Sequence, residues 1–329
     1  MSETAALDAQ FAQFRDDFAA LREQIARAVV GQQAVVDDAL TALCAGGHVL
    51  LEGAPGIGKT LLVRTLAASV ELDFRRIQFT PDLMPADVVG TYVVMESAGR
   101  RKFEFQQGPI FSNVVLIDEI NRATPKTQSA LLEAMQERGV TVANEMYELP
   151  APFFVMATQS LSEIEGTFPL PATQLDRFFF QLRLDFPSEA EIDQILDRTT
   201  EPTVPKVEPV LDGKRILQMS DAVRHVAVAA EVRRWAIRAV LATHPQHDLA
   251  APTARQFVRH GSSPRGAQAM LLAAKVRAIL DGRTHVALDD LKHAALPALR
   301  HRITLNFEGH AEQIEPDRIV REIIDTTPA

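Results

Sequence analysis

The segment Gly53-Ala54-Pro55-Gly56-Ile57-Gly58-Lys59-Thr60 decides the fold of this 329-residue chain. It follows an apolar run at residues 48–51 and precedes a helical pattern that starts at residue 61, so it joins a strand to a helix. In that context the spacing G-x-x-x-x-G-K-T is typical of a phosphate-binding P-loop. Its glycines let the backbone turn N–H groups toward phosphates, and the next helix adds the positive end of its dipole. The alternative, a glycine-rich turn that matches by chance, is disfavoured by the flanking strand and helix.

Two side chains of this loop are candidate ligands for Mg-ATP. We expect the Lys59 ammonium to reach the β- and γ-phosphates and the Thr60 hydroxyl to ligate Mg²⁺. We assign Gly53, Pro55, Gly56, Ile57 and Gly58 to the same nucleotide-binding site. The cofactors predicted by the loop are therefore ATP and Mg²⁺.

A second apolar run, residues 114–117, ends in the acidic pair Asp118-Glu119. We expect Asp118 to hold the Mg²⁺ shell and Glu119 to orient and polarise the attacking water as a general base. The competing interpretation is that these acids only begin a helix, whose N-terminus favours negative charge. The P-loop upstream favours the catalytic interpretation.

Further apolar runs at residues 153–156 and 178–180 alternate with helical patterns. This alternation predicts an α/β fold with a parallel sheet covered by helices on both faces. Two segments fit better as hairpins, one pairing residues 91–95 with 102–105 and the other pairing 140–142 with 146–149. The run from residue 7 to 29 has apolar residues at alternating intervals of four and three, which indicates an amphipathic helix. We expect this helix to pack on the body, and a coiled-coil partner helix is the alternative.

The length of the chain favours two domains, since a single core stops growing at roughly 250–300 residues. A capping box at Ser188-Glu189-Ala190-Glu191 opens a helix, and Pro202, Pro205 and Pro209 are too close together for a helix to continue. We place the interdomain linker there. The prediction is an αβα nucleotide-binding domain at residues 1–199 and a small all-helical lid domain at residues 200–329.

Composition limits the classes of partner and compartment. A net charge of −9 and a pI near 5.5 disfavour a protein whose main ligand is nucleic acid, because that affinity comes from lysines and arginines. The single cysteine, Cys44, cannot form an internal disulfide, and we expect it to pack as a small apolar residue on a helix. With no apolar run of about 18 residues and no signal-peptide pattern, we expect a cytoplasmic protein without direct membrane insertion.

Longer motifs extend these assignments. The stretch Asp118-Glu119-Ile120-Asn121-Arg122-Ala123, with its continuation through residue 137, resembles the MoxR family of AAA+ ATPases. Gly108-Pro109-Ile110, the run at residues 165–171 and Leu175-Asp176-Arg177-Phe178 resemble the same family. The resemblance runs from Val30-Gly31-Gln32 to Leu299-Arg300-His301-Arg302.

The resemblance implies roles for two further positions, Arg177 and Arg265. Arg177 would be the arginine finger, which reaches the γ-phosphate bound by a neighbouring subunit and therefore requires a ring. Arg265 would be sensor 2, projecting from the helical lid toward the nucleotide. Val30 and Leu61 complete the nucleotide-binding residues that we assign. The alternatives are a salt bridge within the subunit for Arg177 and an ordinary exposed arginine for Arg265.

One position departs from the family pattern. Where the family usually has an asparagine as sensor 1 after Ala-Thr-Gln, this chain has Ser160 after Ala157-Thr158-Gln159. A serine hydroxyl still donates and accepts hydrogen bonds but reaches less far than an amide. We therefore expect either slow hydrolysis or compensation by Gln159 or a water, while nucleotide binding stays intact.

The function implied is an ATPase that works as a homo-hexameric ring with ATP bound at the subunit interfaces. The resemblance further implies chaperone-like remodelling, maturation or cofactor insertion of a client protein, with a partner that carries a von Willebrand factor A domain. The two hairpins would be the family's inserts in the ATPase core. One alternative is a nucleotide-gated scaffold that hydrolyses ATP very slowly because of Ser160. Another is a motor on nucleic acid, which the acidic charge and the lack of an appended DNA-binding module disfavour.

Overall fold

A computed structural model describes residues 3–97, 100–159, 166–200 and 206–328 of the chain. Its centre is a five-stranded parallel sheet in the order β2-β5-β8-β1-β9. The strands are β1 Val49–Glu52, β2 Phe74–Gln78, β5 Val114–Asp118, β8 Phe154–Thr158 and β9 Phe180–Arg183. The P-loop strand β1 lies between β8 and β9, so the loop leaves the sheet beside the ends of both neighbours.

The apolar runs predicted to be strands correspond to strands, although one run is shifted relative to its strand and one strand of the sheet was not predicted. The run at 178–180 mostly precedes β9, because β9 begins at Phe180. Strand β2 was not predicted, since its sequence Phe-Arg-Arg-Ile-Gln lacks an apolar run. It lies at the edge of the sheet, where only Ile77 is buried, so packing against β5 compensates for the weak local signal.

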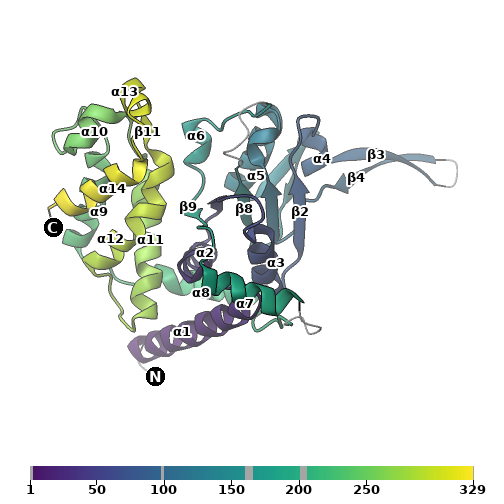
Figure 1. Ribbon diagram of the computed structural model, residues 1–329. Coiled ribbons are helices and arrows are strands. Elements are labelled where there is room, and N and C mark those ends of the chain that lie inside the picture. Colours follow the sequence, from purple (N-terminus) through teal and green to yellow (C-terminus); the bar gives the residue numbers. More distant parts are fainter. Residues whose placement is uncertain (1–2, 98–99, 160–165, 201–205, 329) are drawn as a thin grey trace.

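Helices cover both faces of the sheet, as predicted (Figure 1). One face carries α4 Pro85–Val89 and α5 Pro125–Glu137, and its buried cluster includes Val115 and Ile117. The other face carries α1 Glu3–Ala28, α2 Gln33–Ala45 and α3 Lys59–Ser69, and its cluster includes Val114 and Leu116. Adjacent residues of β5 thus enter opposite cores, as the two-residue period of a strand requires.

The N-terminal helix packs on the body, as expected. Its apolar residues Phe11, Phe14, Phe18, Leu21 and Ile25 are all buried, and the helix contacts α2 and α3 as well as the C-terminal helices. Cys44 is also buried on α2, where burial raises the pKa of its thiol to about 12. Its environment is that of a small apolar side chain.

Both predicted hairpins are present. One pairs β3 Gly90–Ser97 with β4 Arg100–Gln107 and projects from the body (Figure 1). The other pairs β6 Gly139–Val142 with β7 Glu145–Glu148. The hairpins touch through their aromatic residues. The Tyr92 and Tyr147 hydroxyls are 2.7 Å apart, both donate to Glu145, and Tyr147 stacks on Phe105 at a centroid distance of 4.2 Å.

After β9 the chain is almost entirely helical. Helix α7 Glu189–Thr200 opens with the predicted capping box, in which the Ser188 N–H donates to Glu191 at 2.7 Å. Residues 213–326, the C-terminal helical region, then form α8 Gly213–Arg224, α9 Ala230–Ala242, α10 Pro252–Phe257, α11 Pro264–Leu280, α12 Leu288–Leu299, η2 Arg300–Arg302, α13 Phe307–Ala311 and α14 Pro316–Thr326. They include one two-stranded antiparallel sheet, β10 Val258–His260 with β11 Thr304–Leu305, which the all-helical prediction omitted.

The C-terminal helical region packs directly on one side of the nucleotide-binding core (Figure 1). Helix α11 contacts α1 and α2, and a single buried cluster joins Val49 and Leu51 of β1 to Trp235 and Met270 of the helices. The proposed boundary at residues 199 and 200 remains a prediction. Within the described ranges, no helix combines the length and apolar character needed to cross a membrane.

A buried histidine at the start of β1 joins the sheet to α5. The Nε2 of His48 lies 3.2 Å from the Met135 carbonyl and its Nδ1 accepts from the Val155 N–H at 3.0 Å, which defines a neutral imidazole. Burial lowers the pKa of His48 from 6.5 to about 4. Between these values the folded state binds fewer protons than the unfolded state, so the stabilisation is complete above pH 6.5 and is lost as the pH falls toward 4.

We predict that His48→Asn destabilises the fold more at pH 7.5 than at pH 4.5. The difference in the free energy of unfolding between wild type and variant should shrink by about 2 to 3 kcal/mol over this interval. Urea unfolding of both proteins at several pH values measures it. Cys44→Ala is the control, because its buried thiol does not titrate in this range. A His48→Asn effect that is as independent of pH as the Cys44→Ala effect would contradict the prediction.

Candidate nucleotide-binding site and arginine pocket

The P-loop forms an open cradle at the start of α3. Gly56 and Gly58 have φ values of 83° and 93°, and nothing lies within 4 Å of a Cβ built at either position. Left-handed backbone and open space on the same residues suit a loop that wraps an anion at a helix N-terminus. The residues present therefore fit a bound phosphate chain.

The Lys59 ammonium lies inside this cradle. It donates to the carbonyls of Gly53 at 2.7 Å and Ala54 at 2.9 Å. Burial lowers the pKa of Lys59, and the charges of Asp118 and Glu119 oppose that shift. The lysine thus lies in the field of both predicted acids, which places the P-loop and the end of β5 at one site.

Asp118 is almost buried at the end of β5, with 10% of its side chain exposed. Arg76 of β2 pairs with it at 2.5 Å, and the Thr158 hydroxyl donates to its other oxygen at 3.4 Å. The carboxylate of Asp118 and the hydroxyl of Thr60 are oxygen ligands of the type that Mg²⁺ prefers. These two residues are the ones that could hold the ion, and Arg76 neutralises Asp118 in this structure.

Glu119 directly follows the strand in a left-handed conformation, with φ 57°. Its N–H donates to the Thr158 hydroxyl at 2.9 Å, which holds this conformation at the sheet edge. Its carboxylate accepts from the Gln78 amide at 2.8 Å and pairs with Arg122 at 3.2 Å. The carboxylate is therefore held in place by side chains of β2 and η1 Ile120–Arg122.

Arg76 and Gln78 are contacts of the acids that the sequence analysis did not find. Gln78 is in register with Asp118, so the end of β2 lies beside the acidic pair. The only sequence signal is a pair of polar residues two positions apart, which becomes informative only once the strand and its register are known. Ser160, the predicted sensor 1, lies outside the described residues.

A cavity of about 200 Å³ adjoins the P-loop, with walls that are mostly apolar. It brings together five of the predicted nucleotide-binding residues from the P-loop, the first turn of α3 and the segment before α2. These five are Val30, Gly56, Ile57, Gly58 and Leu61. Helix α7 closes the opposite side with Ile195, Arg198 and Thr199.

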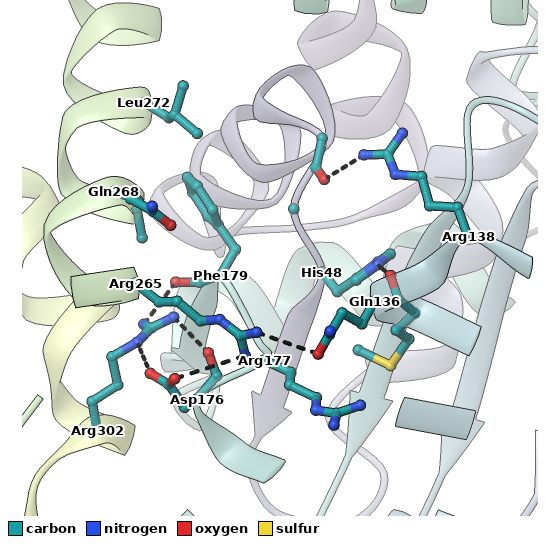
Figure 2. Close-up of a pocket in the computed structure, with 14 residues that line it drawn as sticks. His48, Gln136, Arg138, Asp176, Arg177, Phe179, Arg265, Gln268, Leu272 and Arg302 are labelled. Atoms are coloured by element: carbon teal, nitrogen blue, oxygen red, sulfur yellow. Dashed lines mark hydrogen bonds and ion pairs between the residues drawn. The ribbon is translucent and has the colours of Figure 1, made fainter. Parts of the chain in front are cut away.

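The two predicted arginines lie together in a second pocket of about 340 Å³. An Nη of Arg177 donates to the Leu132 carbonyl at 2.5 Å. An Nη of Arg265 donates to Gln136 at 3.3 Å (Figure 2). Arg265 also approaches Asp176, at 3.8 Å. Both arginines line this pocket, whereas neither lines the cavity beside the P-loop. In this structure, therefore, Arg265 lies in the same pocket as Arg177 and is not among the residues that line the P-loop cavity.

Comparisons with known proteins agree with this architecture. The family described as "ATPase family associated with various cellular activities (AAA)" matches residues 48–180, and the AAA lid domain matches residues 250–323. A protein of known crystal structure from Cytophaga hutchinsonii superposes with a TM-score of 0.92 at 35% identity, covering 100% of this chain and 99% of its own.

Three relatives match over most of their length. The uncharacterized protein YeaC of Bacillus subtilis is 44% identical over 305 residues, which cover 92% of this chain and 91% of YeaC. Chaperone MoxR1 of Mycobacterium tuberculosis is 38% identical and covers 92% of this chain and 80% of its own. Protein MoxR of Methylorubrum extorquens is 34% identical and covers 98% of both chains. The chain therefore belongs to the MoxR family of AAA+ ATPases.

Proposed function

We propose that this protein hydrolyses Mg-ATP at the interfaces of a ring of identical subunits. The observation that carries the proposal is the division of charge between two sites. Lys59, Asp118 and Glu119 converge at the P-loop, whereas Arg177 and Arg265 share a different pocket. A phosphate chain held at the P-loop would receive these arginines from a neighbouring copy, as a ring supplies them.

Nucleotide binding follows from the contacts at the P-loop. The apolar cavity beside Val30 and Leu61 suits a purine base, while the glycine cradle and Lys59 suit the phosphates. Thr60 and Asp118 would hold Mg²⁺, which neutralises phosphate charge when it is bound. Arg76 must then give up part of its pairing with Asp118.

Glu119 is the residue that would orient the attacking water. Its carboxylate is fixed by Gln78 and Arg122, and it lies at the same sheet edge as Asp118. An ionised carboxylate accepts a proton or a hydrogen bond from water, whereas an amide cannot act as the base.

We predict that Glu119→Gln lowers the turnover of ATP about 10²- to 10⁴-fold. The affinity for ATP should change little, because the substitution keeps the size of the side chain and leaves Lys59 and Thr60 in place. Phosphate release and equilibrium binding of a fluorescent ATP analogue measure the two quantities. Lys59→Ala is the comparison, and it should lose binding as well. Equal turnover in wild type and Glu119→Gln would rule out Glu119 as the base.

Arg177 and Arg265 are proposed to act on the ATP of the adjacent subunit. Their guanidinium groups would stabilise the negative charge that develops on the transferred phosphoryl group, and such groups contribute about 10³ to 10⁵ in rate. A subunit that lacks Lys59 can still donate these arginines, and a subunit that lacks Arg177 can still bind ATP.

We therefore predict that two inactive variants, Lys59→Ala and Arg177→Ala, regain activity when mixed. An equal mixture should reach about a quarter of the wild-type turnover, because random assembly makes one interface in four productive. Phosphate release is measured after co-assembly, and mass measurement confirms that mixed rings form. Mixed rings without activity would show that Arg177 does not act between subunits.

A second candidate function is a nucleotide-gated scaffold, and Ser160 is the observation that favours it. In that case rings assemble with ATP, yet wild type and Glu119→Gln hydrolyse it equally slowly. Ser160→Asn separates the two candidates. Acceleration of an already measurable rate supports a motor with a slow sensor, and activity that appears only with Ser160→Asn supports the scaffold.

We propose that the protein forms a homo-hexameric ring that remodels a client protein, matures it or inserts a cofactor into it. The ring would work together with a partner that has a von Willebrand factor A domain. Support for this comes from the family of the chain and from a relative named as a chaperone. The exposed side chains of Val94 and Phe103 on the projecting β3–β4 hairpin give the ring an apolar surface for a client. Pull-down with the von Willebrand factor A protein encoded nearest to this gene tests the partner.

A further inference from the structure

A buried arginine, Arg302, encloses the backbone on both sides of Arg177. Only 2% of its side chain is exposed. Its Nη2 donates to the carbonyls of Asp176 at 3.1 Å and Phe178 at 2.6 Å, the residues directly before and after Arg177. Arg302 belongs to η2 of the C-terminal helical region, whereas the enclosed segment links α6 Ala172–Leu175 to β9 in the core.

The Arg302 guanidinium uses its whole donor capacity. Besides the two bonds from Nη2, Nη1 donates to Phe179 at 3.2 Å and to Ala298, and Nε donates to the Asp176 carboxylate at 3.0 Å. Nη1 also lies 2.9 Å from the Nε2 of His301. Each of the five N–H groups therefore has an acceptor within reach, which lysine with three donors cannot match. Burial lowers the pKa of Arg302 to about 10, so the group is still charged at neutral pH.

The Asp176 carboxylate extends the same contact to Arg265. Its oxygens accept from the Ser263 hydroxyl at 2.7 and 2.8 Å. That hydroxyl in turn accepts from the Arg265 N–H at 3.1 Å as the N-cap of α11. The first turn of α11 also packs closely on Arg302, since a Cβ at Gly266 would lie 3.3 Å from the Arg302 Cδ. One carboxylate therefore bonds to both Arg302 and Ser263, the N-cap of α11. Figure 2 shows the Asp176 carboxylate between Arg302 and Arg265.

We propose that Asp176, Ser263 and Arg302 form a latch that positions Arg177 and Arg265 as one unit. The inference rests on the proposed function, in which both arginines act on the ATP of a neighbouring subunit. Arg177 belongs to the core and Arg265 to the C-terminal helical region, so the spacing of their guanidinium groups depends on how these two parts are joined. The latch joins them directly at the two arginines. Its members are positioning residues, since they hold the arginines and do not themselves reach the phosphate.

Displacement of a charge-stabilising group by about 1 Å can cost about 10²-fold in rate. We therefore expect Arg302→Lys, which keeps the charge but loses two of the five bonds, to lower turnover about 10- to 100-fold. Its affinity for ATP should stay within about twofold of wild type, because the P-loop is intact. Ser263→Ala removes only the hydroxyl link, and we expect a smaller loss of turnover with the same unchanged affinity.

Arg300→Lys is the matched control. Arg300 is the neighbouring arginine and is also mostly buried, with 10% of its side chain exposed, but it bonds to Asp317 at 2.8 Å and the Gln181 carbonyl. In the described part of the chain Arg300 forms no hydrogen bond to residues 176–179, so a general loosening of the C-terminal helical region would affect both variants equally. The latch requires Arg302→Lys to lose more turnover than Arg300→Lys at similar thermal stability.

The decisive experiment mixes Arg302→Lys with Lys59→Ala in equal amounts. Lys59→Ala subunits carry an intact latch, and Arg302→Lys subunits carry an intact P-loop, so activity should rise to about a quarter of the wild-type rate. No rise beyond the sum of the two separate variants would overturn the latch. If Arg302→Lys does not fold, a mixture of Ser263→Ala with Lys59→Ala replaces it. Turnover that does not rise beyond the sum of those two variants would likewise overturn the proposal.

The mixture of Arg177→Ala with Lys59→Ala distinguishes a failure of the latch from a failure of the proposed action between subunits. If that mixture regains activity and the Arg302→Lys mixture does not, the ring mechanism stands and the latch is wrong. If neither mixture regains activity although mixed rings form, the proposed action between subunits is wrong, and the latch with it.

Discussion

The parallel pairing of β1 with β8 and of β8 with β5 is the constraint on which the rest of the structure depends. Parallel strands end at a common edge, so the P-loop after β1, Thr158 at the end of β8 and the acids after β5 meet there. The side chains at this edge then interact with one another through charge and hydrogen bonds. Lys59 lies in the field of both acids, and Thr158 bonds to Asp118 and to the N–H of Glu119. The positions of the charged groups at the nucleotide site thus follow from the register of three strands.

The two predicted arginines lie apart from this edge. Asp118 and Glu119 lie there with the cations Lys59, Arg76 and Arg122, while Arg177 and Arg265 lie in a pocket formed with α5 and α11. Positive charge is most effective on a transferred phosphoryl group when water is excluded from it. In the proposed function, Arg177 and Arg265 act on the ATP of a neighbouring copy, so full charge stabilisation would require assembly of the ring.

Local sequence signals were sufficient to predict the elements that depend on residues close together in the chain. The P-loop, the run ending in Asp118-Glu119, both hairpins and the amphipathic helix α1 were predicted because spacing along the chain determines each of them. Strand β2 was missed, since its pairing with β5 outweighs its polar sequence. Gln78 and Arg302 were missed for a related reason. Their partners lie 41 and 126 positions away in sequence, and only the folded chain brings them together.

The contact between the core and the C-terminal helical region combines two kinds of interaction with different consequences. The apolar part is continuous, because β1, α1, α2 and α11 share one buried cluster, and opening it would expose apolar surface at about 25 cal/mol per Å². The polar part is confined to a few bonds with strict geometry around Asp176 and Arg302. Apolar packing holds the two parts together over a wide area but tolerates small shifts, whereas a guanidinium with five bonds does not. Attachment therefore comes from the cluster, and the spacing of the two arginines comes from the buried charge.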